Sequence, residues 1–221
     1  MRPIPPARAG ALCWALAAPL FLAANLVTGL GWRHPPYSWA TNNISDLGNV
    51  HCGVWDTTRP RYVCSPWHPI MNAGMLLTGA LLAAGVLLTW RALGPGRLIR
   101  VARSLLLLAG VGFALAGVFP ADADENWHFL AALLVLGAGP VGLTLAGLAP
   151  RAGAPGRLRL PTLAAGLLAL TGAVLFVAQR DAGIGMGGME RVAALPYPIW
   201  ACWIGITLFA AGGPARRIRR G

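Results

Sequence analysis

Histidines and carboxylates, which can bind metals or transfer protons, gather in a few short stretches of this 221-residue chain. His68 lies in CSPWHPIMN, where Asn72 follows four residues later on the same helical face and could bind a substrate. His128 ends DADENWH, in which Glu125 lies three residues earlier. We interpret His68, His128 and Glu125 as ligands of a divalent metal, or His68 and His128 as catalytic bases. The simpler alternative is that the histidines only form hydrogen bonds in the headgroup zone.

A second candidate is the polar stretch TNNISDLG, residues 41–48. Asp46 could orient a base or donate a proton, with water or Ser45 as the nucleophile. Asn42, Asn43 and Ser45 could bind a substrate. The alternative is that these side chains cap a short helix, because Ser, Asn and Asp are favoured at N-cap positions.

A third candidate is GIGMGGMER, residues 183–191. It fits the pattern GxGxxG, but it follows an apolar run rather than a strand, so we reject a dinucleotide site. We predict a lid-like loop in which Glu190 orients, ligates or donates a proton and Arg191 binds substrate. The alternative is a simple ion pair between these two side chains.

The elements that must position these residues are membrane spans. The chain is 56% hydrophobic and 11% charged, whereas soluble domains carry about a quarter charged residues. Crossing a bilayer takes about 20 mainly apolar residues. The sequence has six such runs, approximately residues 11–31, 68–90, 101–119, 127–149, 161–179 and 198–213. We therefore predict one all-α domain over residues 1–221, a six-helix membrane bundle with one long extracytoplasmic loop.

The arginines predict the orientation. All 18 basic residues are arginines, and thirteen of them fall in the terminal segments and in the second and fourth connectors. Positive charge is retained in the cytoplasm, so both termini are predicted to be cytoplasmic. The first run is too long for the apolar core of a cleaved signal peptide and is interpreted as a span. The basic clusters lie between spans, which argues against nucleic-acid binding, and the use of Arg without Lys favours a bacterial cytoplasmic membrane.

This orientation places all seven acids and all four histidines on the extracytoplasmic side. The long loop there also contains Cys52 and Cys64, which we predict to form a disulfide rather than part of a zinc site. Cys13 and Cys202 fall inside spans and are expected to be buried, unreactive thiols. Apart from Arg103 near a span end, the helix interiors are uncharged, which disfavours an ion-coupled transporter.

The chain carries an ordered set of motifs: NNISDLG, CSPWHPIMN, GVFPAD followed by His128, and GGMER before YPIW. This set resembles the bacterial and archaeal multi-pass membrane proteins of domain-of-unknown-function family 998. The resemblance runs from about Asn42 to Leu208. It implies a membrane bundle and supplies no activity, substrate or catalytic residues.

Two functional hypotheses follow. The first is an extracytoplasmic-facing enzyme that acts on a lipid or isoprenoid-like substrate by hydrolysis or acid/base rearrangement, with Asp46, His68, His128 and Glu190 as catalytic residues. The second is a non-catalytic membrane module that binds lipid or a partner protein through the long loop. The gathering of polar residues at one mouth of an apolar bundle favours the first.

Overall fold

Apolar helices dominate the computed structural model, which describes residues 6–33, 35–56, 58–149 and 158–211. Within these ranges, six helical segments are long and apolar enough to cross a membrane. They are α1 (Pro6–Gly31), α2 (His68–Leu88), α3 (Arg97–Val118), the run Glu125–Leu148, α7 (Arg159–Val177) and the run Met186–Ala210. The predicted all-α membrane bundle is therefore confirmed.

Two of the spans are composite. The fourth comprises α4 (Glu125–Leu133), a π-helical turn η2 (Leu134–Ala138) and α5 (Gly139–Leu148). The turn ends two residues before Pro140, whose missing N–H interrupts regular helical hydrogen bonding. The sixth comprises α8 (Met186–Ala194) and α9 (Pro196–Ala211). The prediction of a lid-like loop over residues 183–191 is wrong, because a helix begins at Met186.

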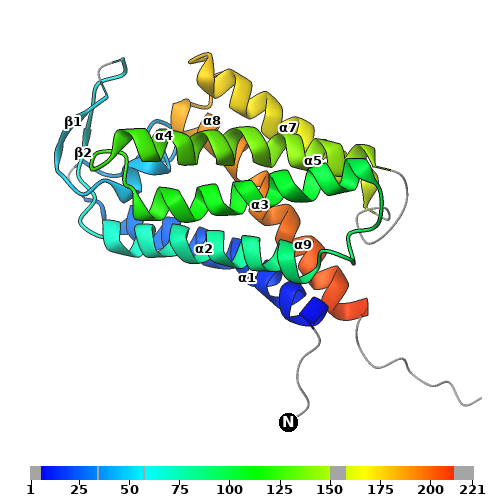
Figure 1. Ribbon diagram of the computed structural model, residues 1–221. Coiled ribbons are helices and arrows are strands. Elements are labelled where there is room, and N and C mark those ends of the chain that lie inside the picture. The colour runs from blue at the N-terminus through cyan, green and yellow to red at the C-terminus, as the bar shows by residue number, and fades with distance from the viewer. Residues whose placement is uncertain (1–5, 34, 57, 150–157, 212–221) are drawn as a thin grey trace, which may run out of the picture.

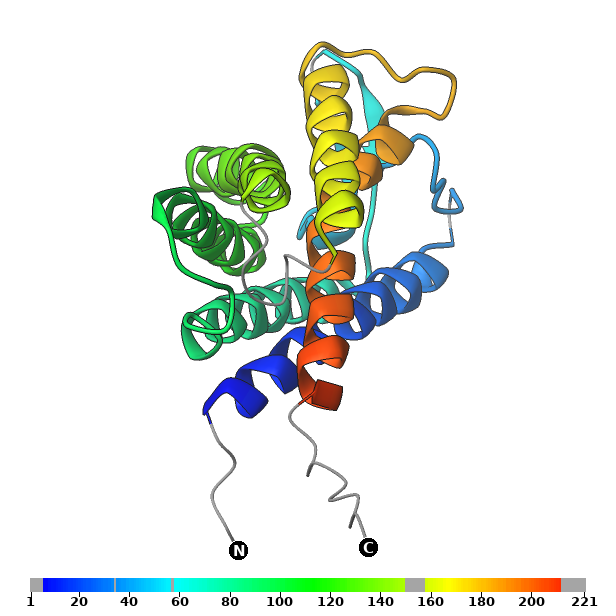
Figure 2. The ribbon, with the colours of Figure 1, turned by 90° about the vertical axis from the view of Figure 1, so that its right-hand side faces the viewer.

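The helices form a bundle in which α2 packs between α1 and α3, α9 packs on α1, and α5 packs between α3 and α7 (Figures 1 and 2). Gly79 on α2 and Gly110 on α3 allow close approach, because a Cβ atom on either would meet the backbone of the other helix. Buried aromatic side chains link other helices. The Tyr197 hydroxyl donates to the Leu106 carbonyl, and Trp200 Nε1 donates to Thr162. Trp200 is thus a core residue.

The long loop after α1 carries the remaining elements, a 3-10 helix η1 (Ser45–Gly48) and strands β1 (Gly53–Trp55) and β2 (Arg61–Val63). The strands pair antiparallel, with Gly53 opposite Val63. No pattern in the sequence predicted this small sheet. Cys52 and Cys64, just outside the two strands, form the predicted disulfide, and Cys13 and Cys202 are free.

We call the end of the bundle that carries η1, β1 and β2 the hairpin end. The start of α1 and the end of α9 lie at the opposite end (Figure 1), where Arg8 stacks on the Phe209 ring at 4.6 Å. Which end faces the cytoplasm stays a prediction from the arginines. Seven of the arginines on which this orientation depends lie outside the described residues: Arg2, Arg151, Arg157, Arg216, Arg217, Arg219 and Arg220. His34 also lies outside them.

Candidate functional site

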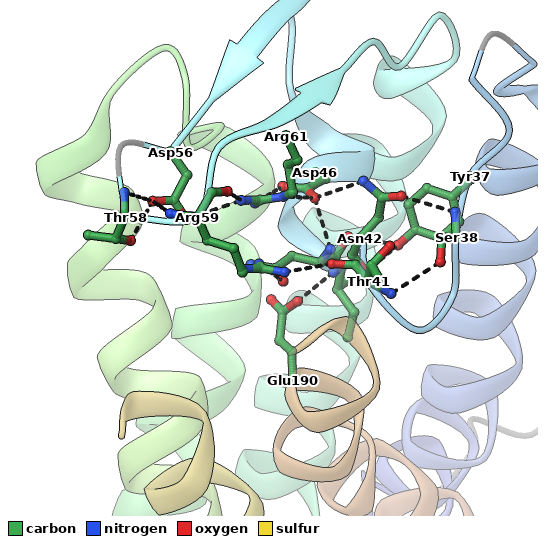
Figure 3. Close-up of polar contacts among 12 residues, drawn as sticks. Tyr37, Ser38, Thr41, Asn42, Asp46, Asp56, Thr58, Arg59, Arg61 and Glu190 are labelled. Atoms are coloured by element: carbon green, nitrogen blue, oxygen red, sulfur yellow. Dashed lines mark hydrogen bonds and ion pairs between the residues drawn. The ribbon is translucent and has the colours of Figure 1, made fainter. Parts of the chain in front are cut away.

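Asp46 is the centre of a buried ion-pair network at the hairpin end (Figure 3). Its side chain is inaccessible to solvent. Arg61 Nε donates to Asp46 Oδ2 at 2.7 Å, and Arg61 Nη2 donates to Oδ1. The Asn43 amide also donates to Oδ2, at 2.9 Å. Burial lowers the pKa of Arg61, but the hydrogen bond and charge of Asp46 outweigh burial and raise it. Both Asp46 oxygens are therefore occupied in holding the loop.

Asp56 and Arg59 extend this network across the hairpin. Asp56 Oδ1 accepts hydrogen bonds from the Thr58 amide and hydroxyl at 2.9 and 2.6 Å, and Oδ2 accepts one from Arg61 at 3.1 Å. Burial raises the pKa of Asp56, but these hydrogen bonds prevail and lower it to about 2. Arg59 donates to the Thr41 carbonyl and to Asn43 Oδ1, each at 2.7 Å. The hairpin thus holds the 41–46 segment through arginine side chains.

Helix α8 holds the same segment from the other side. Glu190 Oε2 accepts the Ile44 amide at 2.5 Å. Arg191 Nη1 donates to the carbonyls of Trp39 and Asn42, both at 3.0 Å. Glu190 and Arg191 form no ion pair with each other, so the simple pairing considered for them is not present. Arg191, predicted to bind substrate, thus donates hydrogen bonds to the protein backbone.

Tyr37 completes the attachment of α8 to the loop. Its hydroxyl donates to the Asn43 carbonyl at 2.7 Å and accepts from Arg191 Nη2. Burial raises the pKa of Tyr37, so the phenol stays neutral and keeps the proton that it donates. The segment around residues 41–46 is thus fixed from three directions.

A cleft of about 560 Å³ opens beside this network, between α4, α7, α8 and the hairpin. Its polar lining comprises Asn43, Ser45, Asp56, Arg61, Glu125, His128 and Glu190. Its apolar lining includes Phe129, Ala132, Leu136 and Phe176. A smaller cavity of about 40 Å³ lies deeper in the bundle and is also lined by Ser45, His128 and Glu190. These three residues therefore lie where the open cleft meets the interior.

The ring of His128 has a defined orientation. His128 Nδ1 lies 2.8 Å from the carbonyl oxygen of Phe119. A carbonyl only accepts hydrogen bonds, so Nδ1 carries the proton in the neutral ring. His128 Nε2 is then the unprotonated nitrogen, the one able to accept a proton or bind a metal. Glu125 and His128, three residues apart in the sequence, both line the cleft.

Of the two predicted site residues on α2, Asn72 and His68, only Asn72 contacts η1 through its side chain. Asn72 Nδ2 donates to the Gly48 carbonyl at 3.0 Å. His68 does not line the cleft, and its Nδ1 is buried without a hydrogen-bond partner among the described residues. Among all the residues that the structure describes, no group of three or more His, Cys, Asp or Glu side chains could hold a metal ion. The predicted ligand set of His68, Glu125 and His128 is therefore not assembled.

A family model described as "Protein of unknown function (DUF998)" matches residues 15–207. The chain belongs to this family. The match includes every residue that lines the cleft in this DUF998 protein. No curated protein and no solved structure matches the chain.

Reasoning from sequence missed the roles of Arg59 and Arg61 in this DUF998 chain, since both were counted only as charges in a loop. One signal was present. Two arginines in an acid-containing loop of a membrane protein could pair with Asp46 and Asp56 rather than remain solvated. The short helix predicted for residues 41–48 is present as η1, but the residue before it is Ile44, and no side chain caps it.

Proposed function

We propose that this membrane protein is an enzyme that performs acid/base chemistry, most directly hydrolysis, on the polar end of a lipid-like substrate bound in the cleft. One observation carries the proposal. Ser45, His128 and Glu190 come from three segments far apart in the chain and line both the cleft and the cavity below it. Positioned groups that exchange protons are the usual basis of such chemistry.

His128 is assigned the role of general base. With Nδ1 held by the Phe119 carbonyl, Nε2 can take a proton from water or from the Ser45 hydroxyl as the oxygen attacks the substrate. The same nitrogen then returns the proton to the leaving oxygen. Glu190, with one oxygen fixed by the Ile44 amide, supplies a positioned carboxyl group beside them. Glu125, one turn before His128, is assigned to orienting the substrate.

The apolar wall supports a substrate that enters from the bilayer. Phe129, Leu136 and Phe176 line the cleft on α4, η2 and α7. Phe129 is 69% exposed, so it lies at the outer surface of the bundle rather than in its core. Figure 1 shows α7 close to α5 at one end and diverging from α4 toward the hairpin end. An amphipathic molecule could thus place its tail among apolar residues and its polar end at His128.

The test is a comparison of lipid composition by mass spectrometry in cells that express the wild type, His128→Ala or Glu190→Gln at equal levels. We expect the wild type to deplete one lipid class and accumulate its product, and both variants to lose this change. His51→Ala is the matched control, because His51 is exposed, pairs with Asp122 and does not line the cleft. A lipid change that persists in His128→Ala would refute the assignment of the base.

A non-catalytic lipid-binding module is the second candidate. One observation favours it, namely that Asp46 and Asp56 are committed to ion pairs and hydrogen bonds with Arg61. Under this alternative, the same lipid would co-purify with the wild type and with His128→Gln, and no product would form with either. Under the enzyme proposal, substrate would accumulate on the inactive variant only.

A further inference from the structure

Two apolar grooves meet at Arg191 on the outer surface of the bundle. The first, here the α7/α9 groove, has a volume of about 390 Å³ and is lined by Leu168, Ile199 and Trp203, among others. The second, here the α1/α8 groove, has a volume of about 380 Å³ and is lined by Leu22, Asn25, Leu26 and Trp39. Arg191 and Leu195 line both grooves. Neither groove includes a residue of the catalytic assignment.

Arg191 brings a positive charge to this junction. Within the described part of the chain, no carboxylate lies within ion-pair distance of its guanidinium. Its neighbour Glu190 is bound to the Ile44 amide and lines the cleft instead. A charge within a membrane-spanning segment is costly unless a counter-charge or water compensates it. The junction therefore favours an anion supplied from outside the chain.

The guanidinium is held in place for such a ligand. Nη1 shares its two hydrogens among three carbonyl oxygens, those of Trp39, Asn42 and Gly187, at 2.8 to 3.0 Å, and Nη2 donates to the Tyr37 hydroxyl. The group also lies 5.2 Å from the ring centre of Trp39 and 5.6 Å from that of Tyr37. Its Nε–H has no partner among the described residues. A fixed, charged donor of this kind binds phosphate well.

The grooves fit the tails of the same molecule. Leu195 lies one helical turn beyond Arg191 in α8, and both grooves include it. From there the α7/α9 groove continues along α9 to Trp203, and the α1/α8 groove lies along the Leu22 to Leu26 turn of α1. Trp39 is 41% exposed beside the charge, as aromatic rings at a headgroup level are.

We propose that Arg191 and these two grooves form a binding site for one two-tailed anionic phospholipid, with its phosphate at Arg191 and one acyl chain in each groove. Charge complementarity selects an anionic over a zwitterionic lipid. The site is separate from the cleft, since α8 presents Glu190 to the cleft and Arg191 to the grooves. It therefore stands whether or not the cleft is catalytic.

The experiment measures lipid adducts retained by the detergent-purified protein in native mass spectrometry, with phosphatidylglycerol or phosphatidylcholine of identical acyl chains. We expect the wild type to retain phosphatidylglycerol several-fold more than phosphatidylcholine. The double variant Leu26→Trp and Leu168→Trp fills one position in each groove and leaves the Arg191 contacts in place. It is expected to lose the preference.

Leu167→Trp is the matched control, because Leu167 is exposed on the same helix and lines neither groove. It should keep the preference. His128→Ala should keep it too, which would show that lipid retention at Arg191 does not depend on the proposed catalytic activity. Soluble glycerol phosphate should not displace the lipid, because it lacks tails. Equal retention of both lipids by the wild type, or an unchanged preference in the double variant, overturns the proposal. If the double variant aggregates, each single substitution is expected to weaken the preference in part and serves as the same test.

Discussion

Glu190 and Arg191 are consecutive residues of α8, and they hold the 41–46 segment in different ways. Glu190 accepts the Ile44 amide at 2.5 Å, whereas Arg191 donates to the Asn42 carbonyl at 3.0 Å. Neighbouring side chains on a helix point about 100° apart, so one turn of α8 contacts the cleft on one side and the apolar grooves on the other. The position of α8 therefore sets the geometry of both sites.

Asp46→Asn is expected to destabilise the hairpin end. The substitution removes the negative charge from a buried pair and leaves Arg61 without its main partner. Breaking a buried ion pair costs about 3 kcal/mol, which we expect as the loss in free energy of unfolding, measured by denaturant titration in detergent micelles. Asp181→Asn is the control, because Asp181 is exposed and an Asn oxygen can still accept the Gly183 amide. Equal stability of Asp46→Asn and the wild type would contradict the structural role.

Acid should loosen the hairpin through Asp56. Its pKa of about 2 in the folded chain lies below the ordinary value of 3.8. A lowered folded pKa gives stability that is fully present above the unfolded pKa, and this stability is lost as the pH falls through the folded pKa. We expect a change in tryptophan fluorescence from Trp55 between about pH 4 and pH 2.

Asp56→Asn separates this transition from general acid unfolding. Asn tolerates the positive φ of 73° at this position, yet it does not titrate. The Trp55 transition should be missing from this variant, whereas a transition that persists unchanged would show that another group is responsible.

Gly187→Ala should detach the start of α8 from the loop. A Cβ atom at Gly187 would collide with the Asn42 carbonyl, whereas one at Gly188 meets only the flexible Ile184 side chain at 3.3 Å. We expect Gly187→Ala to lose about 1 to 3 kcal/mol of unfolding free energy because of overpacking. Gly188→Ala is the adjacent control and should stay within about 1 kcal/mol of the wild type, since alanine also favours the helix. Similar losses in both variants would argue against close contact at Gly187.

Helix α8 also shows which parts of the fold could not be predicted from the sequence. The spans were predictable because each is a long apolar run, and the Cys52 and Cys64 pair was predictable because both lie in one loop that is predicted to be extracytoplasmic. The helix α8 was not, since GIGMGG contains residues that disfavour helices. Gly185 and Gly187 are explained by the close approach of Ala40 and Asn42, which are more than a hundred residues away in sequence. A contact between segments so far apart leaves no local pattern.

In the candidate site, too, features set by local spacing were predictable and features set by distant contacts were not. The local pair Glu125 and His128 was predictable from helical spacing, and both residues line the cleft. The ion pair between Asp46 and Arg61 depends on the fold of the hairpin. Its strands are only three residues long, which is too short to be recognised from a sequence pattern. His68 was placed with His128 only by assuming that all outer-loop residues converge, and the cleft does not include it.

The predicted orientation can be tested by cysteine labelling in intact cells. Val54 is 73% exposed at the hairpin end, and Arg91 is exposed in the connector between α2 and α3 at the opposite end. In a background of Cys13→Ser and Cys202→Ser, the disulfide leaves no other thiol free. Since positive charge is retained in the cytoplasm, a membrane-impermeant maleimide should label Val54→Cys in intact cells. It should label Arg91→Cys only after permeabilisation. The reverse pattern would place the cleft on the cytoplasmic side and change the pool of substrates that can reach it.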